Sequence, residues 1–393
     1  MTEIPLSARA RAITDSITLA ITARAQAMKA QGIDVVSLAA GEPDFPSPDE
    51  VREAGIRAIR EGQTRYTSAT GMADVRAAAA AWFRRHYGLP YEAGDVIVTA
   101  GAKPALMLAL MAVCEDGDRV LLPAPFWASY TDIVKLAGGE PVIVPAVPEQ
   151  DFIHSGAQIA RAARESGAKG IVLNWPNNPS GAVPTREQVE EIVAEAIAAG
   201  LWILSDEIYA RLVYDGREHY SPARCKGAFG RVLVVNGGTK SHSMTGWRIG
   251  FLAGPRAVVD AAGRILSQAM GNACTISQRA VLAVCNETDD SALRERLRAY
   301  DERRRFVVGA INRIPGLRLA TPHGAFYALI DAREACARLR IDDVQLTERL
   351  LADAKVALIP GGPFAIPGFI RLSYAASMKE IEEGVRRIAA YLS

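Results

Sequence analysis

The stretch that decides the fold is VLVVNGGTKSHSMTGWRIGFL, residues 232–252. Its first apolar run, 232–235, has the length and composition of a buried β-strand, and a second apolar run begins at Ile249. Between the two runs lies Lys240. An amine just past a buried strand is poorly solvated, which lowers its pKa and frees its lone pair for attack on a carbonyl. Arg248 adds a fixed cation that suits a phosphate.

A lysine that forms a Schiff base, next to a phosphate-binding arginine, is what pyridoxal 5'-phosphate (PLP) requires. For this stretch by itself, an ordinary loop lysine and a surface arginine remain the alternative, because short motifs often match by chance. The surrounding sequence has to decide between these two interpretations.

Composition restricts the class of protein. The 393 residues suffice for a large domain and a smaller one, with 49% hydrophobic and 23% charged residues, as in soluble globular proteins. A net charge of +1 indicates no nucleic-acid partner. The five cysteines, without a C-x-x-C pair, favour reduced thiols in a cytoplasmic protein, and the five histidines lack the spacing of metal ligands, so we expect no metal. We expect neither a signal peptide nor a membrane span, because the sequence has no apolar run of the length that either requires.

From residue 95 onwards, apolar runs of strand length alternate with helical stretches. The runs do not alternate with polar residues, so both faces of their sheet must be covered. We therefore expect an α/β fold, with a seven-stranded, mostly parallel sheet between helices. The expected strands are residues 96–99, 120–122, 142–144, 171–173, 202–204, 232–235 and 249–253.

After about residue 285 the pattern changes to amphipathic helices with few strands, which indicates a smaller α+β domain. The expected division is an N-terminal arm with a small-domain segment at 1–45, a large cofactor-binding domain at 46–285 and a small C-terminal domain at 286–393.

Polar residues follow four of the expected strands. Ligands of open parallel sheets bind beyond the carboxyl ends of the strands, so these residues should meet at one edge. This convergence is stronger evidence than any single motif. The sets are Gly101, Ala102 and Lys103 after the first strand, Asn178 after the fourth, Asp206 and Tyr209 after the fifth, and Lys240 after the sixth.

The first set would bind an anion. Free backbone N–H groups of Gly101 and Ala102, at a helix N-terminus, suit the phosphate of PLP. Lys103 lies in the first turn of that helix, where a cation opposes the helix dipole. Its position is tolerable if a phosphate or a substrate carboxylate lies beside it. The alternative is a lysine that faces solvent.

The other sets would contact the ring of PLP. Asp206 could keep the pyridine nitrogen protonated, which improves the ring as an electron sink, or it could be a helix N-cap. Asn178 and Tyr209 could donate hydrogen bonds to the phenolic oxygen, or be a turn asparagine and an interface tyrosine. Trp127, in PAPFWASY, could stack on the ring or belong to the core.

Arg371 lies in FIRLSY, between apolar neighbours. An arginine in such a strand is seldom fully buried without a partner. A bidentate carboxylate is its natural partner, either the α-carboxylate of an amino acid or an Asp or Glu of the protein.

Together these motifs resemble the class I/II PLP-dependent aminotransferases of fold type I, and most of all the bacterial aspartate aminotransferase branch. The similarity extends from about Leu6 to the last helix. The matching phrases are AAGEPDFPSP, YTSATG, VTAGAKPAL, PAPFWASY, NWPNNPSGAV, SDEIYARLVY, NGGTKSHSMTGWRIGF, TPHGAFYALID and FIRLSYA.

The resemblance implies a role for each residue around the cofactor. Lys240 would be the Schiff-base lysine and proton shuttle, Asp206 the partner of the pyridine nitrogen, and Trp127 the stacking residue. Asn178 and Tyr209 would contact the phenolic oxygen. The residues around the phosphate would be Gly101, Ala102, Lys103 and Arg248, with Tyr66 reaching the phosphate of the other subunit of a homodimer.

The resemblance also implies a substrate site. Gly41 and Arg371 would hold the α-carboxylate, beside Asn178 and Trp127. Ser16, Thr18 and Lys103 would read a distal carboxylate, as in the aspartate branch.

Two features depart from the family pattern. Gly237 stands where many relatives have a serine that contacts the phosphate, so that hydrogen bond is missing or comes from Thr239. Thr14 and Asp15 replace a lysine–proline pair. An added acid near a dicarboxylate site disfavours aspartate and prephenate as substrates.

We therefore expect an aminotransferase that moves an amino group from an L-amino acid, aspartate-like, to a 2-oxo acid such as 2-oxoglutarate, in two half-reactions with the amine stored on the cofactor between them. The alternatives are a PLP-dependent β-lyase or another α-carbon reaction, and a non-catalytic PLP-binding sensor.

Overall fold

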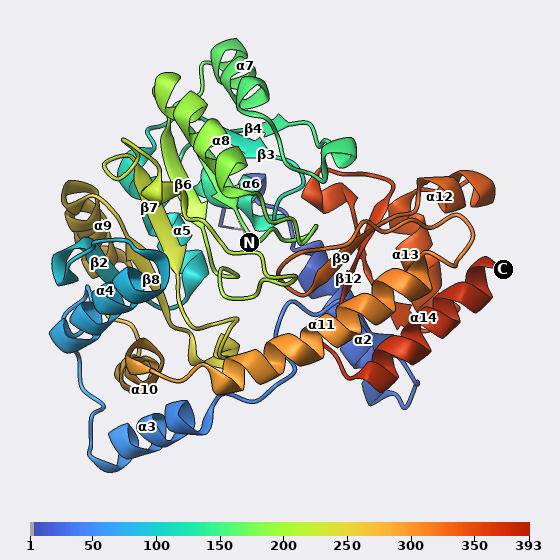
Figure 1. Cartoon of the computed structure of the whole chain (residues 1–393), viewed down its shortest axis with the longest axis horizontal. Coiled ribbons are helices and arrows are strands. Elements are labelled where there is room, and N and C mark those ends of the chain that lie inside the picture. Colours follow the sequence, from blue (N-terminus) through green and yellow to red (C-terminus); the bar gives the residue numbers. More distant parts are fainter. Residues whose placement is uncertain (1–3) are drawn as a thin grey trace.

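The computed structural model describes residues 4–393, and its main feature is a seven-stranded sheet in the order β2-β8-β7-β6-β5-β3-β4 (Figure 1). Neighbouring strands are parallel except at β8, which runs antiparallel to both β2 and β7. The predicted α/β class with a mostly parallel sheet is confirmed. The strands are β2 (Val96–Thr99), β3 (Arg119–Pro123), β4 (Glu140–Val144), β5 (Gly170–Asn174), β6 (Trp202–Asp206), β7 (Val232–Asn236) and β8 (Gly250–Ala253).

Helices cover both faces of this sheet because the strands are apolar on both faces. Successive side chains point to opposite faces, so Val98 belongs to one hydrophobic cluster and Ile97 to another. The first cluster is completed by α4 (Ala73–Tyr87), α7 (Gly156–Ser166), α8 (Arg186–Ala198) and α10 (Thr275–Asn286). The second is completed by α5 (Ala102–Val113), α6 (Ser129–Leu136) and α9 (Arg256–Ala269). Helix α3 (Asp49–Arg60) packs on α10.

A second, smaller group of strands lies beside the large sheet (Figure 1). In it, β12 (Phe369–Ser373) lies between β9 (Tyr327–Asp331) and β11 (Ile359–Pro360), antiparallel to both, while β1 (Val36–Ser37) pairs in parallel with β10 (Val356–Ala357). The helices around them are α11 (Ser291–Ile311), α12 (Arg333–Leu339), α13 (Asp343–Ala352) and α14 (Met378–Leu392).

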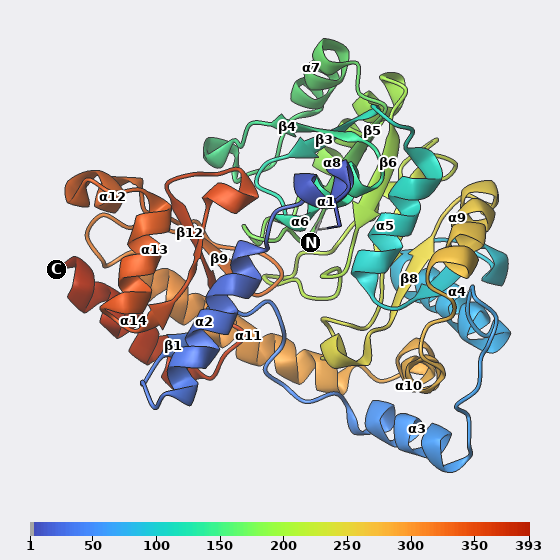
Figure 2. The same cartoon turned by 180° about the vertical axis from the view of Figure 1, so that it is seen from behind.

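The N-terminal segment joins these two parts. Helix α1 (Ala8–Ala12) lies against α6 (Figure 2), and α2 (Ile17–Ala30) lies against β10 and β11. The predicted domain limits at 45/46 and 285/286 stay a prediction, and residues 1–3 of the first predicted segment lie outside the described part. Within residues 4–393, no helix is long and apolar enough to cross a membrane.

Candidate active site

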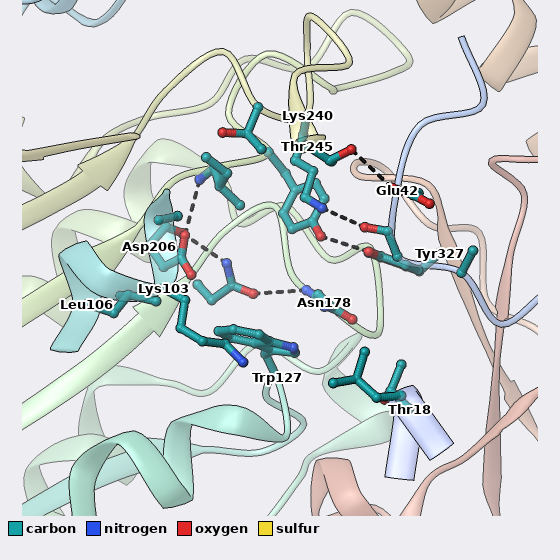
Figure 3. A pocket seen from close by; sticks show the side chains of 18 of the residues that line it. Thr18, Glu42, Lys103, Leu106, Trp127, Asn178, Asp206, Lys240, Thr245 and Tyr327 are labelled. Atoms are coloured by element: carbon teal, nitrogen blue, oxygen red, sulfur yellow. Dashed lines mark hydrogen bonds between the residues drawn. The ribbon is translucent and has the colours of Figure 1, made fainter. Parts of the chain in front are cut away.

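A cavity of about 490 Å³ opens beyond the carboxyl ends of the parallel strands, where the two groups of strands meet (Figure 3). Its wall combines residues from the large sheet, the small sheet and the N-terminal segment. Most of the residues singled out in the sequence line it. They are Thr18, Gly41, Ala102, Lys103, Trp127, Asn178, Asp206, Tyr209, Lys240, Arg248 and Arg371.

Lys240 follows β7, and its amine projects into this cavity. Its Nζ donates a hydrogen bond to the carbonyl oxygen of Gly41 over 2.5 Å and lies 5.9 Å from the centre of the Tyr209 ring. Burial lowers the pKa of this amine from 10.5 to about 8. The negative charge of Glu42 raises this pKa, and the positive charge of Arg371 lowers it further. A substantial fraction of the amine is therefore unprotonated and nucleophilic near pH 8.

Asp206 is the last residue of β6 and is buried. Its carboxylate accepts hydrogen bonds from the Tyr130 hydroxyl at 2.7 Å and from the backbone N–H of Ile208 at 3.3 Å. The chain continues as a turn, so the N-cap alternative is wrong. Burial raises the pKa of this carboxyl to about 6, although the hydrogen bond from Tyr130 opposes the rise. A buried carboxylate of this kind favours a cationic partner such as a protonated ring nitrogen.

This raised pKa predicts that Asp206→Asn stabilises the cofactor-free protein. The pKa of this carboxyl is about 6 in the folded protein and 3.8 in the unfolded chain. Above pH 6 the carboxyl is ionised in both states, and this difference lowers the free energy of unfolding by about 3 kcal/mol. The asparagine cannot ionise and still accepts a hydrogen bond from Tyr130. Urea denaturation should show the full gain at pH 8 and about half of it at pH 5. If the gain in the free energy of unfolding does not increase with pH, the cost of ionising Asp206 in its buried position is not the cause of the stabilisation.

Arg371 lies at the centre of β12 and is 1% exposed. Its Nη1 donates to Oδ1 of Asn178 at 2.9 Å, its Nη2 donates to the carbonyl oxygen of Ala39 at 2.9 Å, and its Nε has no partner. Among the described residues, no Asp or Glu carboxylate forms an ion pair with it, so the internal ion-pair alternative is wrong. Burial lowers the pKa of this guanidinium, as expected of a cation without a counterion. The site therefore fits the carboxylate of a ligand.

The predicted phosphate end is built around Gly101, which precedes α5 and has a φ of +110°. A Cβ at this position would lie 2.6 Å from Nη2 of Arg248, so glycine is needed for the arginine to pack over the helix N-terminus. Nη1 of Arg248 donates to the carbonyl oxygen of Thr245 at 3.0 Å. A cation held over free backbone N–H groups suits a phosphate.

The departure at Gly237 has a structural reason. Its φ is +150°, and a Cβ there would lie 3.3 Å from the Cα of Gly250, so a serine would be crowded. The hydroxyl of Thr239 donates to the carbonyl oxygen of Ile249 at 2.9 Å. The hydroxyl hydrogen of Thr239 is therefore engaged, and it is not free to replace the missing donor.

Lys103 and Trp127 form another wall of the cavity (Figure 3). Nζ of Lys103 lies 4.8 Å from the centre of the Trp127 ring and donates to Oγ of Ser129 at 3.3 Å. Burial and the nearby charge of Arg248 lower the pKa of Lys103. Lys103 is nevertheless largely exposed, so the alternative of a lysine that faces solvent stays open. Trp127 is half-buried and packs against the second hydrophobic cluster while it lines the cavity.

Three predicted residues do not line the cavity. Gly101 lies just behind its wall, under Arg248. Ser16 caps α2 by accepting from the N–H of Leu19. Tyr66 is 98% exposed and lies in a separate surface hollow. Asp15 does not line the cavity either, and Thr14 donates a hydrogen bond to Asp132.

Comparison with known proteins identifies the family. Residues 33–388 match the model described as aminotransferase class I and II. The chain belongs to this family. The aspartate aminotransferase of Bacillus sp. strain YM-2 is 40% identical over 389 residues, which cover 98% of this chain and 99% of the relative. The aspartate/prephenate aminotransferase of Thermus thermophilus is 40% identical over 389 residues, 98% of each chain. A solved structure of the T. thermophilus aspartate aminotransferase with maleate superposes with a TM-score of 0.93 at 38% identity, covering 99% of this chain and 100% of that one.

This class I/II aminotransferase is a PLP-dependent enzyme with the type I fold, as its sequence predicted. The cavity fits the cofactor on independent grounds. An amine with a lowered pKa, a buried carboxyl, and an arginine over the N-terminus of a helix that begins after a glycine all line one cavity. These are the groups that the aldehyde, the ring nitrogen and the phosphate require.

Sequence reasoning missed four residues of the aminotransferase site. Tyr130 bonds Asp206, Asn174 donates to the backbone of Asp206, Tyr327 bonds Tyr209, and Glu42 accepts from Thr245 at 3.0 Å. All four lie in phrases that match the family, and this was the available signal. The phrases are AAGEPDFPSP for Glu42, PAPFWASY for Tyr130, NWPNNPSGAV for Asn174 and TPHGAFYALID for Tyr327.

Proposed function

We propose that this aminotransferase takes its amino group from an acidic L-amino acid of the aspartate type and passes it to a 2-oxo acid such as 2-oxoglutarate. The observation that carries the proposal is that, besides Lys240 and the arginine expected at the phosphate, two more cations line the cavity. They are Arg371 and Lys103, and neither forms an ion pair with a carboxylate of the described chain. Two cations without counterions suit a ligand with two carboxylates. The names of the relatives and the maleate of the T. thermophilus structure, itself a dicarboxylate, support the same choice.

The cofactor, when bound, supplies an electron sink for negative charge at the substrate α-carbon. The residues of the chain do the rest. Arg371, held by Asn178 and Ala39, would bind the α-carboxylate and so fix the orientation of the α-carbon. Nζ of Lys240 is placed to remove the proton from that carbon, because its lowered pKa matches it to work near neutral pH.

The remaining roles follow from position. Asp206 would hold the proton of the ring nitrogen, and Tyr209 and Asn178 would donate to the phenolic oxygen. Trp127 would cover the ring and the side chain of the substrate, and Gly41 would border the α-carboxylate. Gly101, Ala102 and Arg248 would bind the phosphate, with Lys103 near its edge. Thr18 would help Lys103 with the distal carboxylate, with Ser16 nearby at the start of α2.

A spectral half-reaction screen tests the choice of substrate. The bound cofactor should lose its visible band with aspartate or glutamate far faster than with alanine. Release of ammonia and pyruvate without an added 2-oxo acid would instead favour the β-lyase alternative.

Lys103→Ala should lower kcat/KM for aspartate by about 10- to 100-fold, because a charge-assisted bond to the distal carboxylate contributes about 1.5–3 kcal/mol. The rate with alanine, which has no distal carboxylate, should change little. Ser129→Ala is the matched control, since it removes the neutral partner of Lys103 and keeps the amine. Equal losses for aspartate and alanine would contradict a role in specificity.

We also propose a cytoplasmic homodimer with shared active sites. All five cysteines are free thiols, which is usual in a reducing compartment. Tyr66 is 98% exposed, and Ile59 and Met270 are exposed by 57% and 50%, so these side chains are available for contact with a second subunit.

Light scattering should therefore give the mass of two chains. Tyr66→Phe should weaken binding of PLP several-fold without changing that mass, because the lost hydroxyl would contact the phosphate of the other subunit. A monomer with normal cofactor affinity would contradict this arrangement.

A further inference from the structure

Tyr327, to which the sequence assigned no role, lines the cavity (Figure 3). It is fully buried at the start of β9, and its hydroxyl lies 2.7 Å from the hydroxyl of Tyr209. The guanidinium of Arg371 lies 4.6 Å from the centre of its ring. The strand register explains this contact, because Arg371 pairs with Leu329, two residues from Tyr327 on the same face.

The hydroxyl of Tyr327 also limits what can stand at Gly41. A Cβ on Gly41 would lie 3.2 Å from Oη of Tyr327, so a side chain there would crowd the hydroxyl. The carbonyl oxygen of Gly41 holds Nζ of Lys240. Tyr327 thus contacts three residues of the site. They are Tyr209, proposed to bond the phenolic oxygen of the cofactor, Arg371, proposed to bind the α-carboxylate, and Gly41, whose carbonyl oxygen orients the amine of Lys240.

The direction of the hydrogen bond between the two phenols matters. Two hydroxyls that share one bond carry two hydrogens, and the second hydrogen belongs to the acceptor, which can donate it elsewhere. Each of the two rings has a cation over it, but Arg371 lies 4.6 Å from the centre of the Tyr327 ring, whereas Nζ of Lys240 lies 5.9 Å from that of Tyr209. The nearer cation stabilises negative charge on the oxygen of Tyr327 more strongly and makes Tyr327 the better donor. Tyr209 is then the acceptor, and its own hydrogen is free to bond a group inside the cavity.

We propose that Tyr327 is a positioning residue that donates to Tyr209 and thereby directs the hydroxyl hydrogen of Tyr209 to the phenolic oxygen of PLP. The inference rests on the role proposed above for Tyr209. The bond between the phenols also strengthens Tyr209 as a donor, because hydrogen bonds in a chain polarise one another.

Titration of the visible absorbance of the holoenzyme tests this inference, since the absorbance reports the pKa of the linkage between Lys240 and the cofactor. A hydrogen bond to the phenolic oxygen lowers that pKa. Tyr209→Phe should raise it by about one unit, and Tyr327→Phe by a few tenths of a unit, because a polarised donor is stronger by about 10–30% per bond. In the Tyr209→Phe background, Tyr327→Phe should add no further shift, because its path to the cofactor is gone.

Tyr374→Phe is the matched control. Its hydroxyl is buried in the same part of the fold, bonds the carbonyl oxygen of Ala325 at 3.4 Å and does not line the cavity. It should change the melting temperature and leave the linkage pKa unchanged. The inference is overturned if Tyr327→Phe leaves the pKa unchanged while Tyr209→Phe raises it, or if Tyr327→Phe shifts it equally in both backgrounds. No shift with Tyr209→Phe would overturn the proposed role of Tyr209 itself.

Discussion

Lys240→Ala should lower kcat for transamination by about 10⁴-fold or more, because it removes both the group that would bind the aldehyde and the base that would move the α-proton. The amine is suited to both tasks. Burial brings its pKa to about 8, and the carbonyl oxygen of Gly41 fixes its orientation. Lys240→Arg should be nearly as inactive, since a guanidinium does not lose its proton in this pH range.

Steady-state rates with aspartate and 2-oxoglutarate measure this loss, and borohydride reduction gives an independent readout. Reduction should fix the cofactor to residue 240 of the wild type and to no residue of the alanine variant. Lys103→Ala serves as the control, because it removes a lysine of the same cavity and should keep the label. A variant at Lys240 that turns over like the wild type, or a label on another residue, would contradict the assignment.

The pH dependence follows from the same lowered pKa. The attacking form of an amine is the unprotonated one, so the rate at which cofactor-free protein takes up PLP should rise with pH and level off above about pH 8. For a lysine with the ordinary value of 10.5 the rise would continue well beyond pH 9.

Much of the fold was predictable because it depends on local pattern. Apolar runs that do not alternate indicate strands covered on both faces, and all seven expected strands of the large sheet are present. The order of the strands was not predictable from these runs. Nothing in residues 249–253 distinguishes β8, which is antiparallel, from its parallel neighbours, because the hydrophobic pattern records burial and not direction.

The site was predictable where the topology brings residues together. Asp206 ends β6, Tyr209 follows it, and Lys240 follows the neighbouring strand β7, so the sheet itself places them in one cavity. Tyr130 and Tyr327 were missed because each acts through a partner far away in the sequence, and no spacing rule connects them. The role of Tyr66 cannot be read from the fold of one chain, since the phosphate that it is proposed to contact is bound by the second subunit.

Arg371→Met should lower kcat/KM for aspartate by about 30- to 5,000-fold, because truncating one partner of a buried charge pair costs about 2–5 kcal/mol. Arg371→Lys should retain part of the rate, since an ammonium keeps the charge but lacks the planar fork that matches a carboxylate. Alanine as the donor should suffer as much as aspartate, because both carry the α-carboxylate.

Arg371→Met should also raise the free energy of unfolding of the cofactor-free protein. A rise indicates that Arg371 serves binding, whereas a fall indicates that it serves the fold. Arg371 is a buried cation without a counterion in the described chain, and such a charge is costly to desolvate. Arg304 is the matched control, because it is 2% exposed but bonds the carboxylates of Asp215 and Asp301. Arg304→Met should lower the free energy of unfolding at pH 7, and Arg371→Met should raise it, as measured by urea denaturation. If Arg371→Met instead destabilises the protein as strongly as Arg304→Met, the guanidinium serves the fold, and its loss of activity says nothing about the α-carboxylate.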